Sequence, residues 1–474
     1  MLFRSTLISF AVTTDPAKKI ISQEFKEAGD KVILLRPIYT ASGLPDGDSL
    51  KDMYEFFGKL NDSGTVKAAF APGYGGIAEA MFKMGIGNKI GFKLDDKLSL
   101  KDIFNYAYGS IVAEVTDDFS ISYAVDERFN LIELGKTLTE YVAILKDENV
   151  SLEEIEAEYE EKLEPVYKCN IIPESKPIKN FSYREKTSEL SHAPYNIAKP
   201  KVLIPVFPGT NCEYDSAKAF AEAGADTDIF VINNLTSDEV AESVEVFADK
   251  IRQSQIIFIP GGFSGGDEPD GSGKFITSFF RNHEIKNAIG DLLDNRSGLM
   301  IGICNGFQAL IKLGLLPYGK ITEIDENDAT LTFNEIRRHQ SKIVRIRLAS
   351  NKSPWTRSIN TGEIFSVPVS HGEGRFIAPE ALIKGLAEHG QILSQYVDLE
   401  GNATHDIQYN PNGSYYAIEG ITSPDGRVLG KMGHVERIGK DLYRNVPGTY
   451  DMQLFKSAVD RKSTRLNSSH VKLS

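Results

Sequence analysis

The sequence predicts a chain of two folded units, an α+β unit over residues 6–140 and a doubly wound α/β unit over residues 200–460. After residue 200, short β-rich runs alternate regularly with helical patterns, which is typical of a parallel sheet with helices on both faces. Before residue 140 the strands and helices follow no regular βαβ repeat, which favours an α+β fold. Residues 141–199 are acidic at first and then rich in Pro, Ser, Lys and Asn, so we interpret them as a linker with one acidic helix.

Composition and charge exclude several classes of function. A length of 474 residues corresponds to about two to four domains. The formal net charge of −13 argues against a general nucleic-acid or membrane-surface binder, and no apolar run approaches the ~18 residues of a membrane span. The cysteines, Cys169, Cys212 and Cys304, show no CxxC spacing, so they predict neither a disulfide framework nor a metal site. We therefore expect a cytoplasmic globular protein that binds no nucleic acid and no membrane.

The first unit is expected to mix strands and helices. The strands are predicted at residues 7–12, 31–38, 66–72, 90–94, 109–115 and 129–134, and the helices at 49–60 and 74–84. Gly73, Gly75 and Gly76 precede the second of these helices, and such a turn either cradles a phosphate or lets a helix pack closely on a sheet. Both interpretations stay open, although no P-loop Lys-Ser/Thr pair follows. The acidic surface helix of the linker is predicted at residues 151–163.

The second unit is expected to begin as a parallel sheet and to continue with antiparallel strands. Strands are predicted at residues 202–207, 228–232, 255–260 and 299–303, with helices at 214–223, 237–254 and 274–295. Residues 321–421 are strand-like, with hairpin turns at 410–413 and 423–426, and we expect them to extend the sheet. Residues 461–474 are polar and patternless, so we exclude them as a disordered or artefactual tail, and residues 1–5 resemble the same kind of end.

Three glycine-bearing turns place a site in the second unit. They lie at residues 208–211, at 260–266 and around Cys304, each after a predicted strand. Ligands of such sheets bind beyond the carboxyl ends of the strands. Cys304 stands between a buried strand and a helix that ends at Gly314, in the pattern Gly-x-Cys-x-Gly. This pattern is typical of a nucleophile elbow with Cys in place of Ser, and the helix N-terminus favours the thiolate. The alternative is an inert core cysteine.

A thiolate nucleophile needs a base and donors for the oxyanion. His434 and Glu436 are two residues apart in an extended segment, so they face the same way, and Glu436 can orient an imidazole that faces Cys304. The alternative is that His434 is merely a turn histidine. The oxyanion donors are expected from the backbone of Gly262 and Phe263 and from the amide of Asn305. Gln308, one turn along the helix, is expected to bind a polar substrate tail. Together these residues predict Cys-dependent hydrolysis of an amide or an ester.

Several motifs resemble known families. GICNGFQAL, PGGFSGGD and GHVER resemble the class I (triad) glutamine amidotransferases. FPGTNCEYD, HGEGRF and LTFNEIRRHQ are similar to the glutaminase domain of the phosphoribosylformylglycinamidine (FGAM) synthase family, over about residues 200–447. Upstream, SFAVTTDP, FAPGYGGIAEAMFKMGIGN and NYAYGSIVAEV resemble the end of that family's synthetase region, the C-terminal part of its second aminoimidazole-ribonucleotide (AIR)-synthetase-like half.

The resemblance implies an activity in purine biosynthesis. Glutamine, ATP, water and formylglycinamide ribonucleotide (FGAR) would give FGAM, glutamate, ADP and phosphate. Cys304 would be the nucleophile, His434 the base and Glu436 its partner. ATP and Mg²⁺ would serve the synthetase region, and the glutaminase half would need no cofactor. The synthetase region would therefore bind FGAR and ATP, and the second unit would bind glutamine.

The sequence also departs from the family pattern. Val435 replaces a proline but keeps the His–Glu spacing, and residues 70–76 lack the family's acidic motif, so ATP or metal chemistry is not expected there. The family's large N-terminal region is missing from this sequence, so we expect a C-terminal fragment with incomplete nucleotide sites. Two alternatives remain, namely the glutaminase of another triad amidotransferase and a non-catalytic binding or redox module on the same fold.

Overall fold

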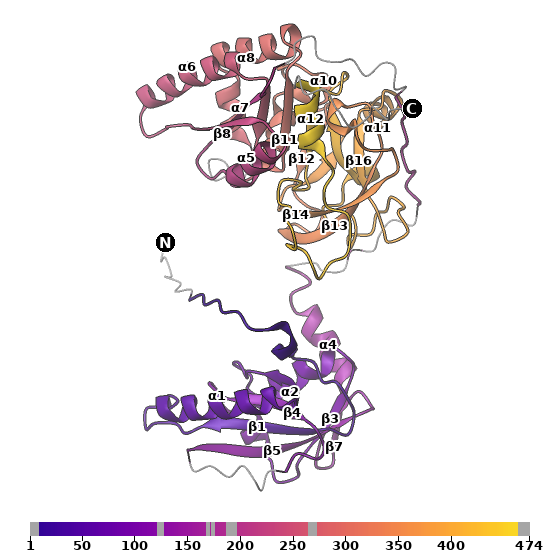
Figure 1. Cartoon of the computed structure of the whole chain (residues 1–474). Helices are drawn as coiled ribbons and strands as arrows, with labels where there is room; N and C mark the ends of the chain where they lie inside the picture. Colours follow the sequence, from indigo (N-terminus) through magenta and orange to yellow (C-terminus); the bar gives the residue numbers. More distant parts are fainter. Residues whose placement is uncertain are drawn as a thin grey trace, which may run out of the picture. The chain divides into compact units, whose positions relative to one another are not determined.

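The computed structural model describes residues 9–120, 128–166, 171, 176–185, 197–263 and 273–462. The chain divides into two compact units, Met1–Pro165 and Val166–Ser474, and each is described by itself (Figure 1). Several sequence predictions lie outside the described residues, namely those on residues 1–5, on Cys169, on the loop beyond Phe263 and on residues 463–474. None of the helices in the described part of the chain is long and apolar enough to cross a membrane.

The first unit contains a seven-stranded mixed sheet. Its order is β2 (Val66–Phe70), β4 (Ile111–Val115), β1 (Lys31–Pro37), β5 (Phe129–Leu138), β3 (Gly91–Leu94), β6 (Val142–Leu145) and β7 (Glu148–Ser151). Neighbouring strands run antiparallel except β3 and β6, which run parallel. A mostly antiparallel sheet with separate helices confirms the α+β prediction.

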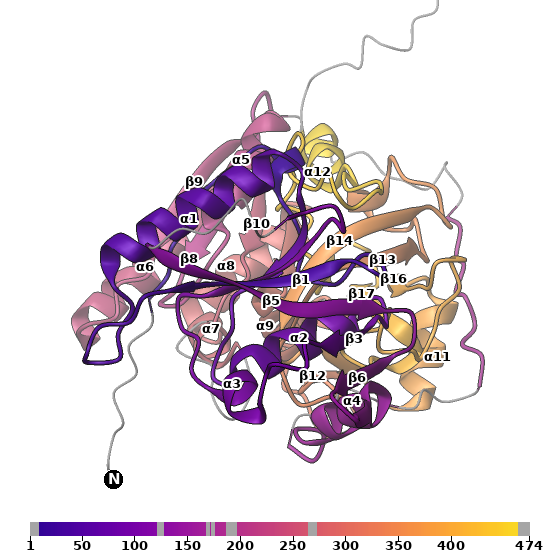
Figure 2. The same ribbon diagram turned by 90° about the horizontal axis from the view of Figure 1, so that it is seen from below.

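Helices cover both faces of this sheet. The helical segments are η1 (Ala17–Lys19), α1 (Gly47–Asp62), α2 (Gly76–Ile86), α3 (Leu100–Phe104) and α4 (Leu152–Glu161). Side chains of β1 alternate, so Val32 and Leu34 share a core with α2, whereas Leu35 packs with Met53 of α1. The two helices accordingly lie on opposite sides of β1 (Figure 2).

The glycine turn before α2 serves packing in this structure. A Cβ at Gly76 would lie 2.4 Å from the backbone oxygen of Asn105. The N–H of Gly75 donates to the Glu79 carboxylate at 2.8 Å. Because an acidic side chain of the chain itself binds this amide, close packing is favoured over the phosphate-binding interpretation.

The second unit contains a nine-stranded sheet. Its strands, in spatial order, are β14 (Ile364–His371), β13 (Gln340–Leu348), β16 (Ile392–Tyr396), β17 (Ile418–Thr422), β18 (Val428–Lys431), β11 (Leu299–Ile303), β10 (Ile256–Ile259), β8 (Lys201–Val206) and β9 (Asp226–Val231). The strands from β18 to β9 run parallel, and those from β14 to β18 run antiparallel. The predicted parallel sheet with an antiparallel addition is thus confirmed. A separate two-stranded sheet pairs β12 (Thr330–Thr332) with β15 (Arg375–Ile377).

Helical segments surround this sheet. They are α5 (Glu213–Glu222), α6 (Ser237–Gln253), α7 (Lys274–Phe280), α8 (His283–Gly290), η5 (Asp291–Asn295), α9 (Asn305–Lys312), α10 (Leu315–Tyr318), η6 (Pro354–Thr356), α11 (Glu380–Glu388), η7 (Tyr415–Ala417) and α12 (Leu454–Lys462). The central strands β10 and β11 are completely buried, and their apolar side chains form the middle of the core. They thereby fix the positions of the turns at their carboxyl ends, which contain Gly262 and Cys304.

Four local predictions need correction. Residues 9–12 form no strand, and Phe10 and Val12 are exposed. Residues 142–161 belong to the first unit rather than to a linker, because β6 and β7 pair at its sheet edge. The helix predicted at 274–295 is divided into three segments, because the Asn282 side chain caps a new helix. The helix α12 continues to Lys462, beyond the predicted domain end at 460.

The two predicted hairpin turns differ in outcome. Residues 423–426 join the antiparallel strands β17 and β18, as expected. Residues 410–413 join no paired strands. Instead, the Asn412 side chain donates to Gly374 O at 2.6 Å and to the Tyr396 hydroxyl at 3.1 Å. This turn therefore braces the loop after β14.

The described part of the predicted linker lies along the second unit. Ile178 and Phe181 pack against its core, and the N–H of Phe181 donates to Gln395 Oε1 at 2.8 Å. Tyr183 forms a parallel bridge with Ser350. These contacts explain why a Pro- and Ser-rich segment carries scattered large apolar residues.

Candidate active site

Cys304 occupies the turn between β11 and α9. Its backbone angles are φ 52° and ψ −106°, a strained conformation for a residue with a side chain. Its side chain is buried, and the thiol faces Ser370 O at 3.7 Å. The structure thus has the sharp strand-to-helix corner that the Gly-x-Cys-x-Gly pattern predicts.

Both glycines of the pattern are required by close backbone contacts. A Cβ at Gly302 would lie 2.5 Å from the carbonyl carbon and oxygen of Gly306. A Cβ at Gly306 would lie only 2.1 Å from the backbone oxygen of Ile259 on the neighbouring strand β10. The corner therefore forms only because neither flanking residue has a side chain.

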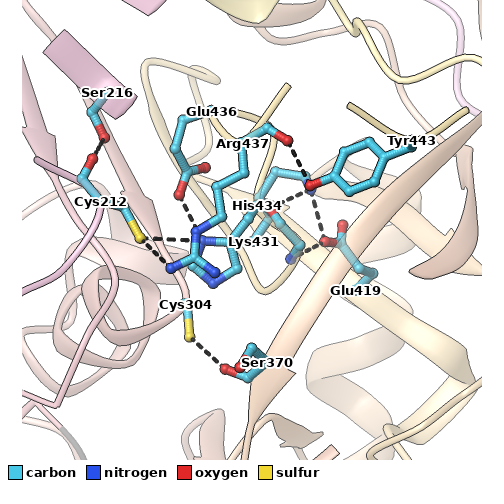
Figure 3. A network of polar contacts seen from close by, with 11 residues as sticks. Cys212, Ser216, Cys304, Ser370, Glu419, Lys431, His434, Glu436, Arg437 and Tyr443 are labelled. Carbon is cyan, nitrogen blue, oxygen red and sulfur yellow. Dashed lines mark hydrogen bonds and ion pairs between the residues drawn. The ribbon is translucent and has the colours of Figure 1, made fainter. Parts of the chain in front are cut away.

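His434 lies beside Cys304. β18 pairs in parallel with β11, so the segment that follows β18 emerges at the same edge of the sheet as the Cys304 corner. A Cβ at Gly261 would lie 2.8 Å from His434 Cε1 and 3.3 Å from Cys304 Cβ, which places both side chains against the same glycine. His434 Nδ1 is 2.6 Å from Glu436 Oε1, and all three side chains are buried (Figure 3). The structure thus brings together the three residues that the sequence predicts as nucleophile, base and orienting carboxylate.

The electrostatics of the His–Glu pair favour a charged imidazole. Burial alone lowers the pKa of His434, but the Glu436 carboxylate and hydrogen bonds with Cys212 and Cys304 outweigh burial and raise this pKa well above its usual value. Burial raises the pKa of Glu436, and the facing imidazole more than offsets this, so the pKa of Glu436 is lowered. The pair therefore holds a proton on His434 while Glu436 stays ionised.

Cys212 is a neighbour of the triad that the sequence did not indicate. Its Sγ lies 3.9 Å from His434 Nδ1 and accepts a hydrogen bond from the Arg437 guanidinium at 2.9 Å (Figure 3). Two features of the sequence could have indicated its role. Cys212 directly follows the glycine turn at 208–211, and the GHVER motif contains the arginine that binds it. The ligand atoms of Cys212, His434 and Glu436 lie within 4.8 Å of one another, which is compatible with a metal site. These atoms are, however, engaged by Arg437 and by the His–Glu hydrogen bond, so we interpret the cluster as a polar network.

The predicted oxyanion donors differ in availability. The N–H of Phe263 donates to Gly209 O at 2.8 Å, so this amide does not face a substrate in this structure. Gly262 has a φ of +137°, and a Cβ there would lie 2.4 Å from the same oxygen, so the turn after β10 packs tightly on the turn after β8. Asn305 is the first residue of α9, so its backbone amide lies at the N-terminal end of the helix, beside Cys304.

Gln308 has a structural role in this conformation. It is buried, accepts from Asn305 Nδ2 at 3.0 Å and donates to Glu373 O. The side chain that we expected to bind a substrate tail thus joins α9 to the loop after β14. At the end of β14, His371 is buried beside Asn334, with Nδ1 and Oδ1 at 3.2 Å, and burial lowers the pKa of His371 to about 3.

The second unit of this chain is similar to known proteins. The model of the CobB/CobQ-like glutamine amidotransferase domain matches residues 199–460. Phosphoribosylformylglycinamidine synthase subunit PurQ of Methanococcus maripaludis (strain C5) is 39% identical over 241 residues, which are 50% of this chain and 83% of that protein. The subunit PurQ of Aquifex aeolicus is 31% identical over 244 residues, which are 51% of this chain and 92% of that protein. Among solved structures, PurLQS from Thermotoga maritima has 26% identity and a TM-score of 0.40, and the match covers 55% of this chain and 98% of that one.

Proposed function

This chain belongs to the CobB/CobQ-like glutamine amidotransferases, as the glutaminase part of an FGAM synthase, and we propose that its second unit hydrolyses glutamine through Cys304, His434 and Glu436. The observation that carries the proposal is the strained, buried corner at Cys304, with an imidazole beside it whose Nδ1 is 2.6 Å from a carboxylate oxygen. A structural cysteine needs neither the strain nor the imidazole.

The proposed reaction is acyl transfer to a thiol. His434 holds the proton taken from the Cys304 thiol, and Cys304 Sγ attacks the side-chain carbonyl carbon of glutamine. His434 returns this proton to the amide nitrogen as the C–N bond breaks, which releases ammonia and leaves a thioester on Cys304. Water, deprotonated by His434, then attacks the thioester and gives glutamate and the free thiol. Glu436 holds the imidazole in one orientation and stabilises its charged form.

The oxyanion of the tetrahedral intermediate needs preorganised donors. We propose the backbone amides of Asn305 and Gly262 for this role, with the helix N-terminus of α9 adding a favourable dipole. The Phe263 amide can join them only if its hydrogen bond to Gly209 O breaks. Gln308 is proposed to support the site by holding the loop that contains Glu373, rather than to bind glutamine directly.

We further propose that the ammonia serves the complete FGAM synthase reaction. The relatives from Methanococcus maripaludis and Aquifex aeolicus are named as subunits of phosphoribosylformylglycinamidine synthase, which supports this proposal. In this proposal a synthetase region binds FGAR, ATP and Mg²⁺, and the first unit of this chain represents the end of that region. The reaction, in purine biosynthesis, converts FGAR, glutamine, ATP and water into FGAM, glutamate, ADP and phosphate in the cytoplasm.

A glutaminase assay with two matched cysteine variants tests the triad. Cys304→Ala is expected to reduce glutamate formation to background, because the thioester cannot form. Cys212→Ala removes a thiol that also lies against His434 but is expected to leave a substantial rate. Equal losses in the two variants would contradict the assignment of Cys304 as the nucleophile.

A further inference from the structure

We infer that the buried ion pair between Lys431 and Glu419 positions His434 relative to Cys304, an inference that rests on the proposed glutaminase function. Lys431 Nζ and Glu419 Oε1 are 2.8 Å apart, and both side chains are completely buried (Figure 3). Lys431 is the last residue of β18, and Glu419 lies on the neighbouring antiparallel strand β17. Lys431 thus lies on the strand beside β11, which leads to the nucleophile, and Glu419 lies one strand further away.

Stability alone is a weak reason for such a pair. Removing two charges from water costs free energy that their mutual attraction repays only with good geometry and further hydrogen bonds, and apolar side chains of similar volume often serve equally well. A pair that is completely buried therefore calls for a role that apolar residues cannot take. Its remaining contacts indicate that role.

Both charges bind the peptide groups of Gly433, the residue before His434. Glu419 Oε1 accepts from Gly433 N at 2.7 Å, and Lys431 Nζ donates to Gly433 O at 2.9 Å. A Cβ at Gly433 would lie 2.9 Å from Glu419 Oε1 and 3.0 Å from Lys431 Nζ, so only glycine lets the pair approach this closely. The N–H and the C=O of one residue are therefore held by two opposite charges, and the C=O belongs to the peptide bond that leads into His434.

The same lysine also holds the nucleophile. The N–H of Cys304 donates to Lys431 O at 2.9 Å, continuing the parallel ladder between β11 and β18. The main chain of Lys431 thus fixes Cys304, while its side chain fixes the turn before His434. On the other side, Ser394 Oγ donates to Glu419 Oε2 at 2.5 Å and holds the carboxylate in place. Hydrogen bonds to charged groups are stronger than neutral ones, which suits a site where a displacement of about 1 Å can cost roughly 100-fold in rate.

The consequence is that Lys431 and Glu419 are positioning residues for the glutaminase reaction. Their side chains act through the N–H and the C=O of Gly433, and they touch no reacting atom in doing so. Apolar replacements would leave the Gly433 N–H and C=O without buried partners, and the turn would shift to satisfy them.

The test is a double variant, Lys431→Met with Glu419→Gln, assayed in the full chain. It removes both charges together, so no unpaired charge remains in the core. We expect kcat for glutamine hydrolysis to fall about 10- to 100-fold while KM changes little, and alkylation of Cys304 by iodoacetamide to slow. The matched control is Lys250→Met with Asp228→Asn, a pair at 2.7 Å on α6 and β9, away from the triad. It is expected to leave kcat and the alkylation rate unchanged.

Three outcomes would overturn the inference. A double variant that melts at the wild-type temperature and keeps the wild-type kcat would overturn it, as would an equal loss of kcat in the control pair. If the double variant does not fold, Ser394→Ala decides, because it removes only the hydroxyl that holds Glu419 and is expected to lower kcat several-fold in a protein that still folds. An unchanged kcat in that variant would also overturn the inference. Failure of the proposed function is distinct, since wild-type protein would then hydrolyse no glutamine at all.

Discussion

Replacement of Gly306 by alanine tests why the nucleophile turn has its sequence. The new Cβ would lie 2.1 Å from the backbone oxygen of Ile259, whereas ordinary contacts begin at about 3.4 Å. Because the contacted atom belongs to the backbone of the buried strand β10, no side chain can rotate away. The N-terminus of α9 must therefore move from β10 by more than an ångström.

The expected magnitudes follow from this displacement. Overpacking costs about 1–3 kcal/mol, and we expect the upper end here, less about 1 kcal/mol gained from the better helix propensity of alanine. The net loss of about 2 kcal/mol corresponds to a fall in Tm of roughly 4–8 °C for a domain of this size. A shift of about 1 Å in Cys304 relative to His434 predicts a loss of about 100-fold in kcat.

Thermal unfolding and a glutaminase assay on Gly306→Ala measure both quantities. The control is Gly385→Ala in α11, where a Cβ meets no heavy atom within 4 Å. This control is expected to raise stability by up to about 1 kcal/mol and to leave activity unchanged. If Gly306→Ala kept the wild-type Tm and kcat, the corner would not depend on this close contact.

Three further outcomes are expected. Glu436→Gln removes the carboxylate that raises the pKa of His434, so kcat/KM should fall about 10- to 100-fold and the limb of the pH–rate profile that reports loss of the His434 proton should move to lower pH; an unmoved limb would contradict this. Burial holds the pKa of His371 at about 3, below the 6.5 of an unperturbed histidine, so the unfolded chain takes up this proton first. The free energy of unfolding should then fall by up to about 1.4 kcal/mol per pH unit below pH 6.5, and urea titrations of His371→Gln should show a smaller slope than wild type. Gly262→Ala places a Cβ 2.4 Å from Gly209 O and should raise KM for glutamine in steady-state kinetics, whereas unchanged kinetics would show that the packing of the two turns does not shape the site.

The sequence was most informative where one local pattern had one physical solution. Glycines on both sides of Cys304 predicted a turn with no room for Cβ atoms, and the positive φ of Cys304 shows that turn. The alternation of buried strands and helices after residue 200 likewise predicted the parallel sheet, because such strands must be apolar on both faces.

The sequence was less informative where partners come from distant segments. Cys212 and Glu419 lie in stretches of the chain that are distant from His434 in sequence, and only the sheet topology brings them to the turn that contains it. The prediction for Gln308 rested on its polar side chain and its position one turn from the nucleophile. Such a residue can bind a substrate or hold a loop, and in the structure Gln308 holds the loop that contains Glu373.

The hairpin of β6 and β7 shows a different difficulty. Its turn has Lys146 at φ 54°, a conformation that usually selects Asn or Gly. Without that signal, the hairpin was grouped with the acidic helix that follows it, and the end of the first unit was placed too early. The predicted end of the first unit was therefore wrong because the turn of this hairpin lacks the residues that usually mark one.

The most direct test of the whole account is the site of covalent labelling by a glutamine-like electrophile. The intact chain would be incubated with a glutamine analogue that carries a diazoketone, digested and examined by mass spectrometry. The account predicts one label, on Cys304, that glutamine prevents in proportion to its concentration and that Glu436→Gln slows. Labelling of Cys212 in preference to Cys304, or labelling that glutamine does not prevent, would contradict it.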